Sequence, residues 1–344
     1  MGLSAFWIVL GEVIGVFLSW HFMAAKFKNL TDRYNSRTVP DFLHSHFNAK
    51  TNTIRIIAAT ALSAFVVIYV SAQIDITGKT FESFLGYNYY NGIFIGFGIV
   101  VAYIFSGGVL AVAWSDIFQG SLMFVALLIL PIVAYFQLPT DTNFLEGLSD
   151  IDPSLLNIWG DGGFNLLNAF SVIGLLSIGI GFLGSPQVYV RFIAIRDSAE
   201  IKKGKIVAVL YTLITSSSAV VIGMLGRFMF TTSNQNPELA LGVAGENVLY
   251  LLLIDIMPNV IVGFYIAALL SAVMSTVDSL LVVASSAVTR DFYQQIINPN
   301  ADSQLLINLS KKVTLALAFF ALFVAISVSL LSPDRTIFWF VIFG

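Results

Sequence analysis

A cluster of oxygen-bearing side chains interrupts the apolar segment 259–287. Its members are Ser271, Ser275, Thr276, Asp278, Ser279, Ser285 and Ser286. Side chains three and four residues apart share one helix face, so the hydroxyls of Ser275 and Thr276 and the backbone carbonyl of Ala272 can converge on one point. Neutral hydroxyl and carbonyl oxygens are hard ligands that suit a small cation such as Na⁺. Hydroxyls in membrane helices also bond back to their own helix or bridge to a neighbour, and the sequence leaves both interpretations open.

Four acidic residues lie within apolar segments, namely Glu12, Asp75, Asp116 and Asp278. Ionisable groups at membrane depth are costly and mark either a function or a buried pair. Asp75 lies near one end of its segment, where solvation would account for it. Glu12 lies between two glycines that would let another helix approach, which favours a structural hydrogen bond. Asp116 begins its segment, so capping of a helix N-terminus and lining of a cation path are both open.

The segment 164–190 is rich in residues that interrupt helices. Four glycines and a proline fall within 13 residues, at Gly174, Gly179, Gly181, Gly184 and Pro186. This density predicts a broken helix. Irregular backbone at membrane depth is tolerated only where it is buried in protein or lines a cavity, and transporters build binding sites from such breaks. Close packing of helices through small residues would require the same composition.

The elements that position these residues follow from composition. Of the 344 residues, 57% are hydrophobic and 11% charged, against roughly 45–50% and about 25% in soluble domains. Charge-free runs of about 20 residues, the length that crosses a bilayer, separate the charged clusters. These features indicate an all-α polytopic membrane protein. The absence of cysteine excludes disulfides and thiolate metal clusters, and a net charge of −3 argues against a nucleic-acid partner.

Eight complete membrane spans are predicted. They lie at 3–25, 57–78, 91–107, 109–138, 164–189, 206–230, 259–287 and 313–332. A tight turn at 106–108 must separate the third span from the fourth. A ninth apolar run begins at Ile337 and stops at Gly344, so residues 1–344 are expected to form a single transmembrane domain that is truncated at its C-terminus.

The basic residues predict the orientation of the spans. One set of loops carries 14 of the 17 lysines and arginines: Lys26, Lys28, Arg33, Arg37, Lys50, Arg55, Arg191, Arg196, Lys202, Lys203, Lys205, Arg290, Lys311 and Lys312. The opposite loops carry only Lys79, Arg227 and Arg335. Because basic loops remain in the cytoplasm, a multi-pass protein of the cell membrane with its N-terminus outside is expected.

Several ordered motifs resemble those of the sodium:solute symporter family, and its sodium/proline branch in particular. They are TVPDF at 38–42, Gly107-Gly108 with AWSDIFQG at 113–120, GSPQ at 184–187 leading into Arg191-Phe192, AALLSAVMST at 267–276 and SSAVTRDFY at 285–293. The resemblance covers nearly the whole chain. It implies a LeuT-type inverted-repeat fold that works by alternating access.

The resemblance also implies roles for individual residues. Ala272, Ser275 and Thr276 would be the sodium ligands from their helix, and Asp116 would lie on the inner route by which sodium leaves. Substrate-facing positions would be Tyr69, Ile178, Phe182 and Pro186. Ile178 and Phe182 fall where proline-type members have Trp and Tyr, which puts proline itself in question while leaving a small organic solute as the cargo.

Family members carry two further spans before the position of Met1 and several after that of Gly344. The second of the earlier spans is the broken helix that completes the sodium site. On this comparison the chain is expected to be a fragment that holds one wall of the site.

The expected function is Na⁺-coupled symport of a small organic solute, such as proline or another amino acid, across a lipid bilayer. A membrane sensor that keeps the solute-binding fold is the main alternative. An ion channel would require a continuous polar stripe along several spans. An enzyme is disfavoured, because His21, His44 and His46 lie on or near one loop without a matching ligand set in a span. The sequence does not predict the oligomeric state.

Overall fold

The computed structural model describes residues 1–106, 109–141, 143–233 and 235–332, and every regular element in them is helical. The chain divides into two compact units. Unit 1 comprises Met1–Ala24, Ser121–Ser185 and Asp197–Ala268, and unit 2 comprises Ala25–Gly120, Pro186–Arg196 and Leu269–Gly344. Helices α6 (Val109–Phe136) and α13 (Asn259–Ser286) contribute to both.

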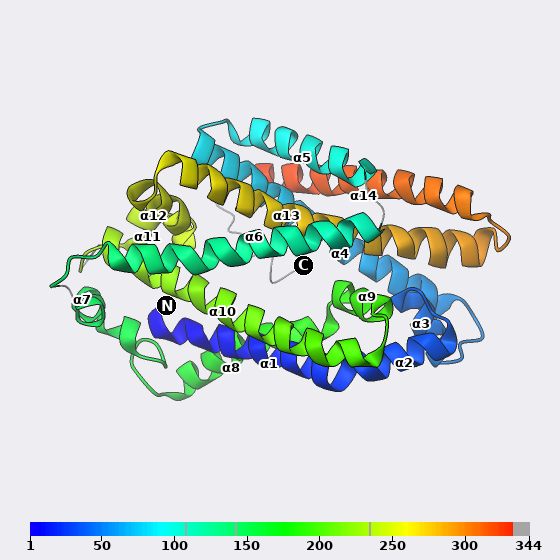
Figure 1. Cartoon of the computed structure of the whole chain (residues 1–344), viewed down its shortest axis with the longest axis horizontal. Coiled ribbons are helices and arrows are strands. Elements are labelled where there is room, and N and C mark those ends of the chain that lie inside the picture. Colours follow the sequence, from blue (N-terminus) through cyan, green and yellow to red (C-terminus); the bar gives the residue numbers. More distant parts are fainter. Residues whose placement is uncertain (107–108, 142, 234, 333–344) are drawn as a thin grey trace. The chain divides into compact units, whose positions relative to one another are not determined.

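Unit 1 is built on the first helix of the chain. The α-helices that lie wholly within it are α1 (Phe6–Leu18), α7 (Phe144–Ile151), α8 (Leu166–Gly181), α10 (Ser198–Phe230), α11 (Pro237–Leu241) and α12 (Val248–Ile256). Helix α1 packs against α8 and α10 (Figure 1). Backbone meets backbone at two glycines of α1, because a Cβ on Gly11 would lie 2.9 Å from the carbonyl carbon of Leu176 and one on Gly15 would lie 2.7 Å from that of Gly179. Small residues therefore set the separation of α1 and α8.

Unit 2 is built around the long helix α4. The helices of this unit are α2 (Ala24–Tyr34), α3 (Val39–His46), α4 (Thr53–Leu85), α5 (Tyr89–Ser106), α9 (Pro186–Ala194), the π-helix Ala287–Ile297 and α14 (Ser303–Leu331). Helix α4 packs against α3, α5, α14 and the π-helix, and Figure 1 shows α5 and α14 running beside it. Its left-handed C-cap, Gly86 (φ 65°), ends the helix after 33 residues.

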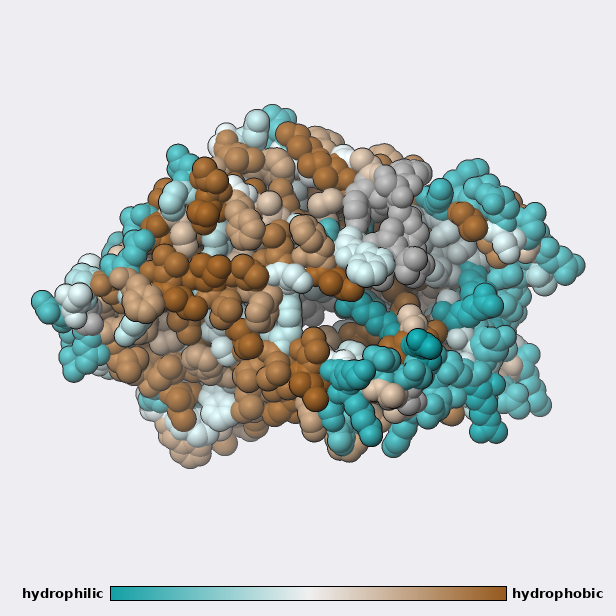
Figure 2. Space-filling model, viewed as in Figure 1, coloured by the Kyte–Doolittle hydropathy of each residue, from teal (hydrophilic) through white to brown (hydrophobic). Residues whose placement is uncertain are grey.

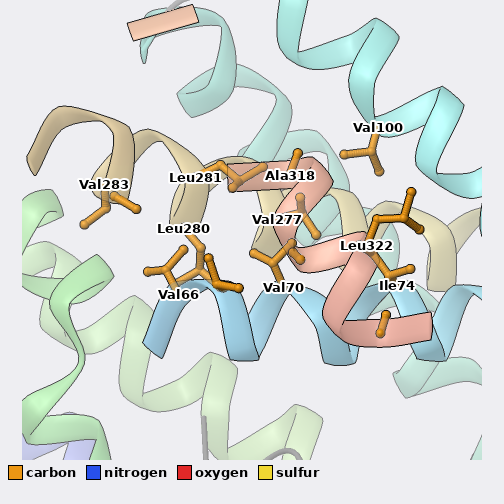
Figure 3. Close-up of a cluster of buried hydrophobic side chains, with 14 of the residues drawn as sticks. Val66, Val70, Ile74, Val100, Val277, Leu280, Leu281, Val283, Ala318 and Leu322 are labelled. Carbon is orange, nitrogen blue, oxygen red and sulfur yellow. The ribbon is translucent and has the colours of Figure 1, made fainter. Parts of the chain in front are cut away.

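The core of unit 2 is an apolar cluster shared by four helices. Figure 3 shows Val66, Val70 and Ile74 of α4, Val277, Leu280 and Leu281 of α13, Ala318 and Leu322 of α14 and Val100 of α5, all buried. Van der Waals packing of this kind is the main force that joins helices within a membrane. It holds the apolar face of α13 in place and thereby positions the hydroxyl cluster of the same helix.

The helix break predicted within 164–190 is confirmed. Helix α8 ends at Gly181, a 3₁₀ turn covers Phe182–Gly184, and Ser185 is extended (φ −67°, ψ 111°). Helix α9 then begins at Pro186, whose missing N–H is no cost at a first helical position. Close packing, the alternative reason for the small residues, applies as well, since Gly179 lies in the contact with α1.

Seven helices among the described residues are long and apolar enough to cross a bilayer. The shorter apolar helix Tyr89–Ala102 lies in the third predicted span. In the space-filling view, hydrophobic side chains cover most of α10 and hydrophilic ones gather where it begins (Figure 2). Exposed Ile206, Val207 and Leu210 follow the basic start of this helix. The predicted turn at 107–108 and the ninth run from 337 lie outside the described residues.

Candidate functional site

The three candidate sodium ligands lie on the part of α13 that belongs to unit 2. The Thr276 hydroxyl donates a hydrogen bond of 3.0 Å to the carbonyl oxygen of Ala272. Two oxygens this close can serve one hard cation with ligand distances of about 2.3–2.6 Å, as found for Ca²⁺. The bond is also the back-bonding that the sequence left open, so the two interpretations concern the same pair of atoms.

Asp116 lies beside these ligands. Ser275 donates to one of its carboxylate oxygens at 2.5 Å, and Ser279 donates to the other at 3.2 Å. The Asp116 side chain is 19% exposed. Helix α6 begins at Val109, so Asp116 lies about two turns inside the helix and the capping interpretation is wrong. Its carboxylate instead places a negative charge next to the hydroxyl of Ser275.

Arg191 completes this polar cluster. Its guanidinium donates to Asp116 at 2.9 Å and to Ser279 at 3.1 Å. Sequence reasoning placed Arg191 among the basic loop residues and Ser279 among the hydroxyls, but did not connect them. Helix α9 carries Arg191 to Asp116, and no local pattern in the sequence predicts a contact between residues 75 positions apart. We call Asp116, Arg191, Ser275 and Ser279 the aspartate cluster.

Asp278 lies on the same helix as this cluster and is 1% exposed. Both of its carboxylate oxygens are buried and neither has a hydrogen-bond partner among the described residues. Isolated buried carboxylates are costly. Asp278 therefore adds an uncompensated acidic group to the helix that carries the candidate ligands.

The four candidate substrate residues divide between the units. Tyr69 of α4 is half-buried against the core of unit 2, and Pro186 begins α9 in the same unit. Ile178 and Phe182 belong to unit 1, one turn apart where α8 passes into its 3₁₀ turn. Ile178 is 39% exposed and Phe182 is half-buried. Tyr69 thus lies on α4, and the other three lie at or next to the helix break.

Two of the acids within apolar segments have structural partners. Asp75 is fully buried, which overturns the solvated interpretation, and it accepts a 2.5 Å hydrogen bond from the hydroxyl of Tyr89. Lys79 lies 3.8 Å from its other oxygen. Helix α5 folds back on α4 and buries the end of α4 that the sequence suggested was wet. Glu12 accepts a 2.5 Å bond from Ser216 of α10, the structural hydrogen bond expected of it.

A second buried charged cluster, which sequence reasoning missed, joins α3, α4 and the π-helix. Arg55 donates to Asp41 at 2.9 Å and lies 3.7 Å from Asp291, which accepts a 2.9 Å bond from Thr38. Asp41, Arg55 and Asp291 are each at most 8% exposed as whole residues. Thr38 also caps α3 by accepting from the N–H of Asp41. The TVPDF motif thus bonds the start of α3 to the π-helix that directly follows α13, the helix with the candidate ligands.

The fold defines a polytopic helical membrane protein that carries a polar, charged cluster on one of its long apolar helices. The sequence model of the sodium:solute symporter family matches residues 1–343. The chain belongs to that family, in agreement with the resemblance found in the sequence. The family is one of transporters and not of enzymes.

Curated relatives include proline transporters of bacteria. The high-affinity proline transporter PutP of Bacillus subtilis is 33% identical over 331 residues, which are 94% of this chain and 67% of that protein. The osmoregulated proline transporter OpuE of the same organism is 30% identical over 340 residues (98% and 65%). A sodium/proline symporter of Staphylococcus aureus is 32% identical over 297 residues (86% and 56%). The chain therefore spans between 56% and 67% of the length of these relatives.

A solved structure of a Na⁺-coupled sialic acid symporter in a substrate-bound, outward-open state has the same fold. It matches 96% of this chain and 71% of its own length, with a TM-score of 0.73 and 20% sequence identity. The predicted LeuT-type helical transporter fold is confirmed by this match.

Proposed function

We propose that the protein is a Na⁺-coupled symporter of a small organic solute, in which α13 supplies one wall of the sodium site. The observation that carries the proposal is the proximity of the Thr276 hydroxyl to the Ala272 carbonyl, with the Ser275 hydroxyl bonded to the Asp116 carboxylate next to them. Three neutral oxygens near one carboxylate suit a small monovalent cation.

Coupling follows if Na⁺ and the solute favour the same conformation of the transporter. Each ligand can shift the conformational equilibrium only by its difference in affinity for the two states, and the effect is reciprocal. The transporter lies in the cell membrane with the basic loops in the cytoplasm, so the N-terminus of this chain faces outward and Asp116 lies on the route by which sodium reaches the cytoplasm.

An amino acid such as proline is the proposed solute. The support is that relatives at 30–33% identity are named proline transporters. Tyr69, Ile178, Phe182 and Pro186 are the proposed substrate-facing residues. Ile178 and Phe182 make two of these positions less polar than in proline-type members, which favours a solute with a larger apolar part.

The test is uptake of radiolabelled proline by proteoliposomes that contain the complete gene product, under an inward gradient of Na⁺ or of K⁺. Uptake should require Na⁺. Thr276→Val, which removes the hydroxyl at constant shape, should raise the Na⁺ concentration for half-maximal uptake by about ten- to a hundredfold, the size expected for loss of a bond to a charged group. Ser275→Ala should act in the same direction.

Thr314→Val on α14 is the matched control. Thr314 makes the same bond to the carbonyl four residues before it, at 2.9 Å, but lies outside the proposed site. The Na⁺ concentration for half-maximal uptake by this variant should therefore equal that of the wild type. Uptake that ignores the Na⁺ gradient would exclude the proposed function. Na⁺-dependent uptake of another solute, without uptake of proline, would agree with the proposed sodium site and exclude proline as the solute.

A further inference from the structure

The guanidinium of Arg191 lies against the same carboxylate group that contacts a proposed sodium ligand. One Asp116 oxygen accepts from Ser275, a proposed sodium ligand. The other accepts from Arg191 at 2.9 Å and from Ser279 at 3.2 Å, and Arg191 also donates to Ser279 at 3.1 Å. A positive charge of the protein itself is therefore already bound to the carboxylate that contacts Ser275.

Helix α9 holds Arg191 in this position. Phe192 is fully buried and Val188 is 7% exposed, one helical turn apart, so these two residues anchor the helix within unit 2. The Arg191 side chain is 57% exposed and reaches the aspartate cluster across the surface of this short helix. Its backbone is fixed while more than half of its side-chain surface is exposed.

The ion pair is of a kind that another cation can displace. Pairs that involve a largely exposed arginine contribute little to stability, because water and salt compete for both partners. Two positive charges within a few ångströms of each other also repel. A Na⁺ ion held at Ser275 and the Arg191 guanidinium cannot both gain the full attraction of Asp116.

We propose that Arg191 is an intramolecular competitor of Na⁺ for Asp116. The proposal rests on the proposed function and adds a residue that sets the affinity for sodium. When Na⁺ approaches Asp116, it displaces the guanidinium. When the guanidinium returns to Asp116 and Ser279, it weakens the hold on Na⁺ and promotes its release. Arg191 acts through Asp116 and is not itself a sodium ligand.

The test is equilibrium binding of radioactive Na⁺ to the purified complete gene product in detergent, without solute. Arg191→Gln should lower the dissociation constant for Na⁺ by about two- to fivefold, the range that an exposed ion pair of this kind supports. Arg191→Lys keeps the charge but not the planar fork that contacts Asp116 and Ser279 together, so it should give a smaller shift in the same direction. Arg196→Gln, which removes an exposed arginine five residues further on, is the matched control and should leave the constant unchanged.

A double-mutant cycle separates competition from a structural role. In an Asp116→Asn background there is no carboxylate to compete for, so adding Arg191→Gln should have no further effect on Na⁺ binding. Weaker or unchanged binding in Arg191→Gln, or an effect that persists in the Asp116→Asn background, would overturn the inference. If Arg191→Gln does not fold, the Arg191→Lys result decides by the sign of its shift.

The two proposals fail in different ways. Wild-type protein that neither binds Na⁺ nor depends on it for uptake would exclude the proposed function and this inference together. Wild-type protein that binds Na⁺, with no tightening in the Arg191 variants, would exclude only the role of Arg191.

Discussion

Replacing Gly15 by alanine is expected to destabilise unit 1, whereas the same replacement at Gly174 is expected to stabilise it. A Cβ on Gly15 would meet the backbone of Gly179, with its carbonyl carbon at 2.7 Å and its carbonyl oxygen closer still. A Cβ on Gly174 would meet nothing within 4 Å. Gly174 lies on α8, the same helix as Gly179, whose backbone Gly15 contacts, so it serves as a control on the same pair of helices.

The magnitude follows from two opposing effects. Alanine in a helix interior is favoured over glycine by about 1 kcal/mol. Inserting a methyl group into a filled contact costs about 1–3 kcal/mol. The upper end applies at Gly15, because the obstructing atoms are backbone and cannot rotate away. The net expectation is a loss of about 2 kcal/mol for Gly15→Ala and a gain of about 1 kcal/mol for Gly174→Ala.

Thermal unfolding of the two variants in one detergent measures this difference. At roughly 2 °C per kcal/mol for a protein larger than 150–250 residues, Tm should fall by about 4 °C for Gly15→Ala and rise by about 2 °C for Gly174→Ala. Gly179→Ala should behave like Gly15→Ala, since its Cβ would meet the backbone of Gly11 and Glu12. Shifts of the same sign at Gly15 and Gly174 would refute the backbone-to-backbone contact of α1 with α8.

Two further predictions concern charged groups. Arg55→Gln should cost about 3–5 kcal/mol of stability, because it removes the cation that pairs with the buried carboxylate of Asp41 and lies 3.7 Å from that of Asp291, and a fall in Tm of the detergent-solubilised protein would measure it. Hydrogen bonds from Ser154 lower the pKa of Asp152 below its ordinary value. The stability that Asp152 contributes is therefore complete above about pH 4 and is lost as the pH falls through the lowered pKa, so Tm should fall more steeply on acidification in wild type than in Asp152→Asn.

Both predictions have a clear contrary outcome. Lys203→Gln removes an exposed base that lies 3.7 Å from Glu200 and should change stability by no more than about 0.5 kcal/mol. A loss in Arg55→Gln as small as that of Lys203→Gln would mean that the charged cluster around Arg55 is not stabilising. Identical acid profiles for wild type and Asp152→Asn would exclude the Ser154 bonds as the cause of the lowered pKa.

Much of the architecture could be predicted because it depends on local composition. The break after Gly181 follows from glycines and a proline, which act on their own backbone within a few residues. The pairing of the Ala272 carbonyl with the Thr276 hydroxyl follows from helix geometry alone, since residues four apart always meet on one face. Glu12 was placed correctly for a similar reason, because the glycines on either side of it admit a neighbouring helix.

Other features could not be predicted because their partners are distant in sequence. Asp75 is near the end of an apolar run, and only the return of α5 against α4 buries it and brings the Tyr89 hydroxyl to it. The cluster of Asp41, Arg55 and Asp291 joins residues up to 250 positions apart. Nothing in the residues around Arg55 distinguishes it from the other bases that were assigned to the loops.

The sequence by itself determined that this is a helical membrane protein with hydroxyl and carbonyl oxygens aligned on one span, since hydrophobic length and helical periodicity are properties of neighbouring residues. The tertiary structure alone decided which charge each acid faces. Asp116 became the partner of Arg191, Ser275 and Ser279 only through the packing of segments distant in sequence within unit 2. Electrostatic interactions depend on distances in space, and those distances exist only once the helices have packed.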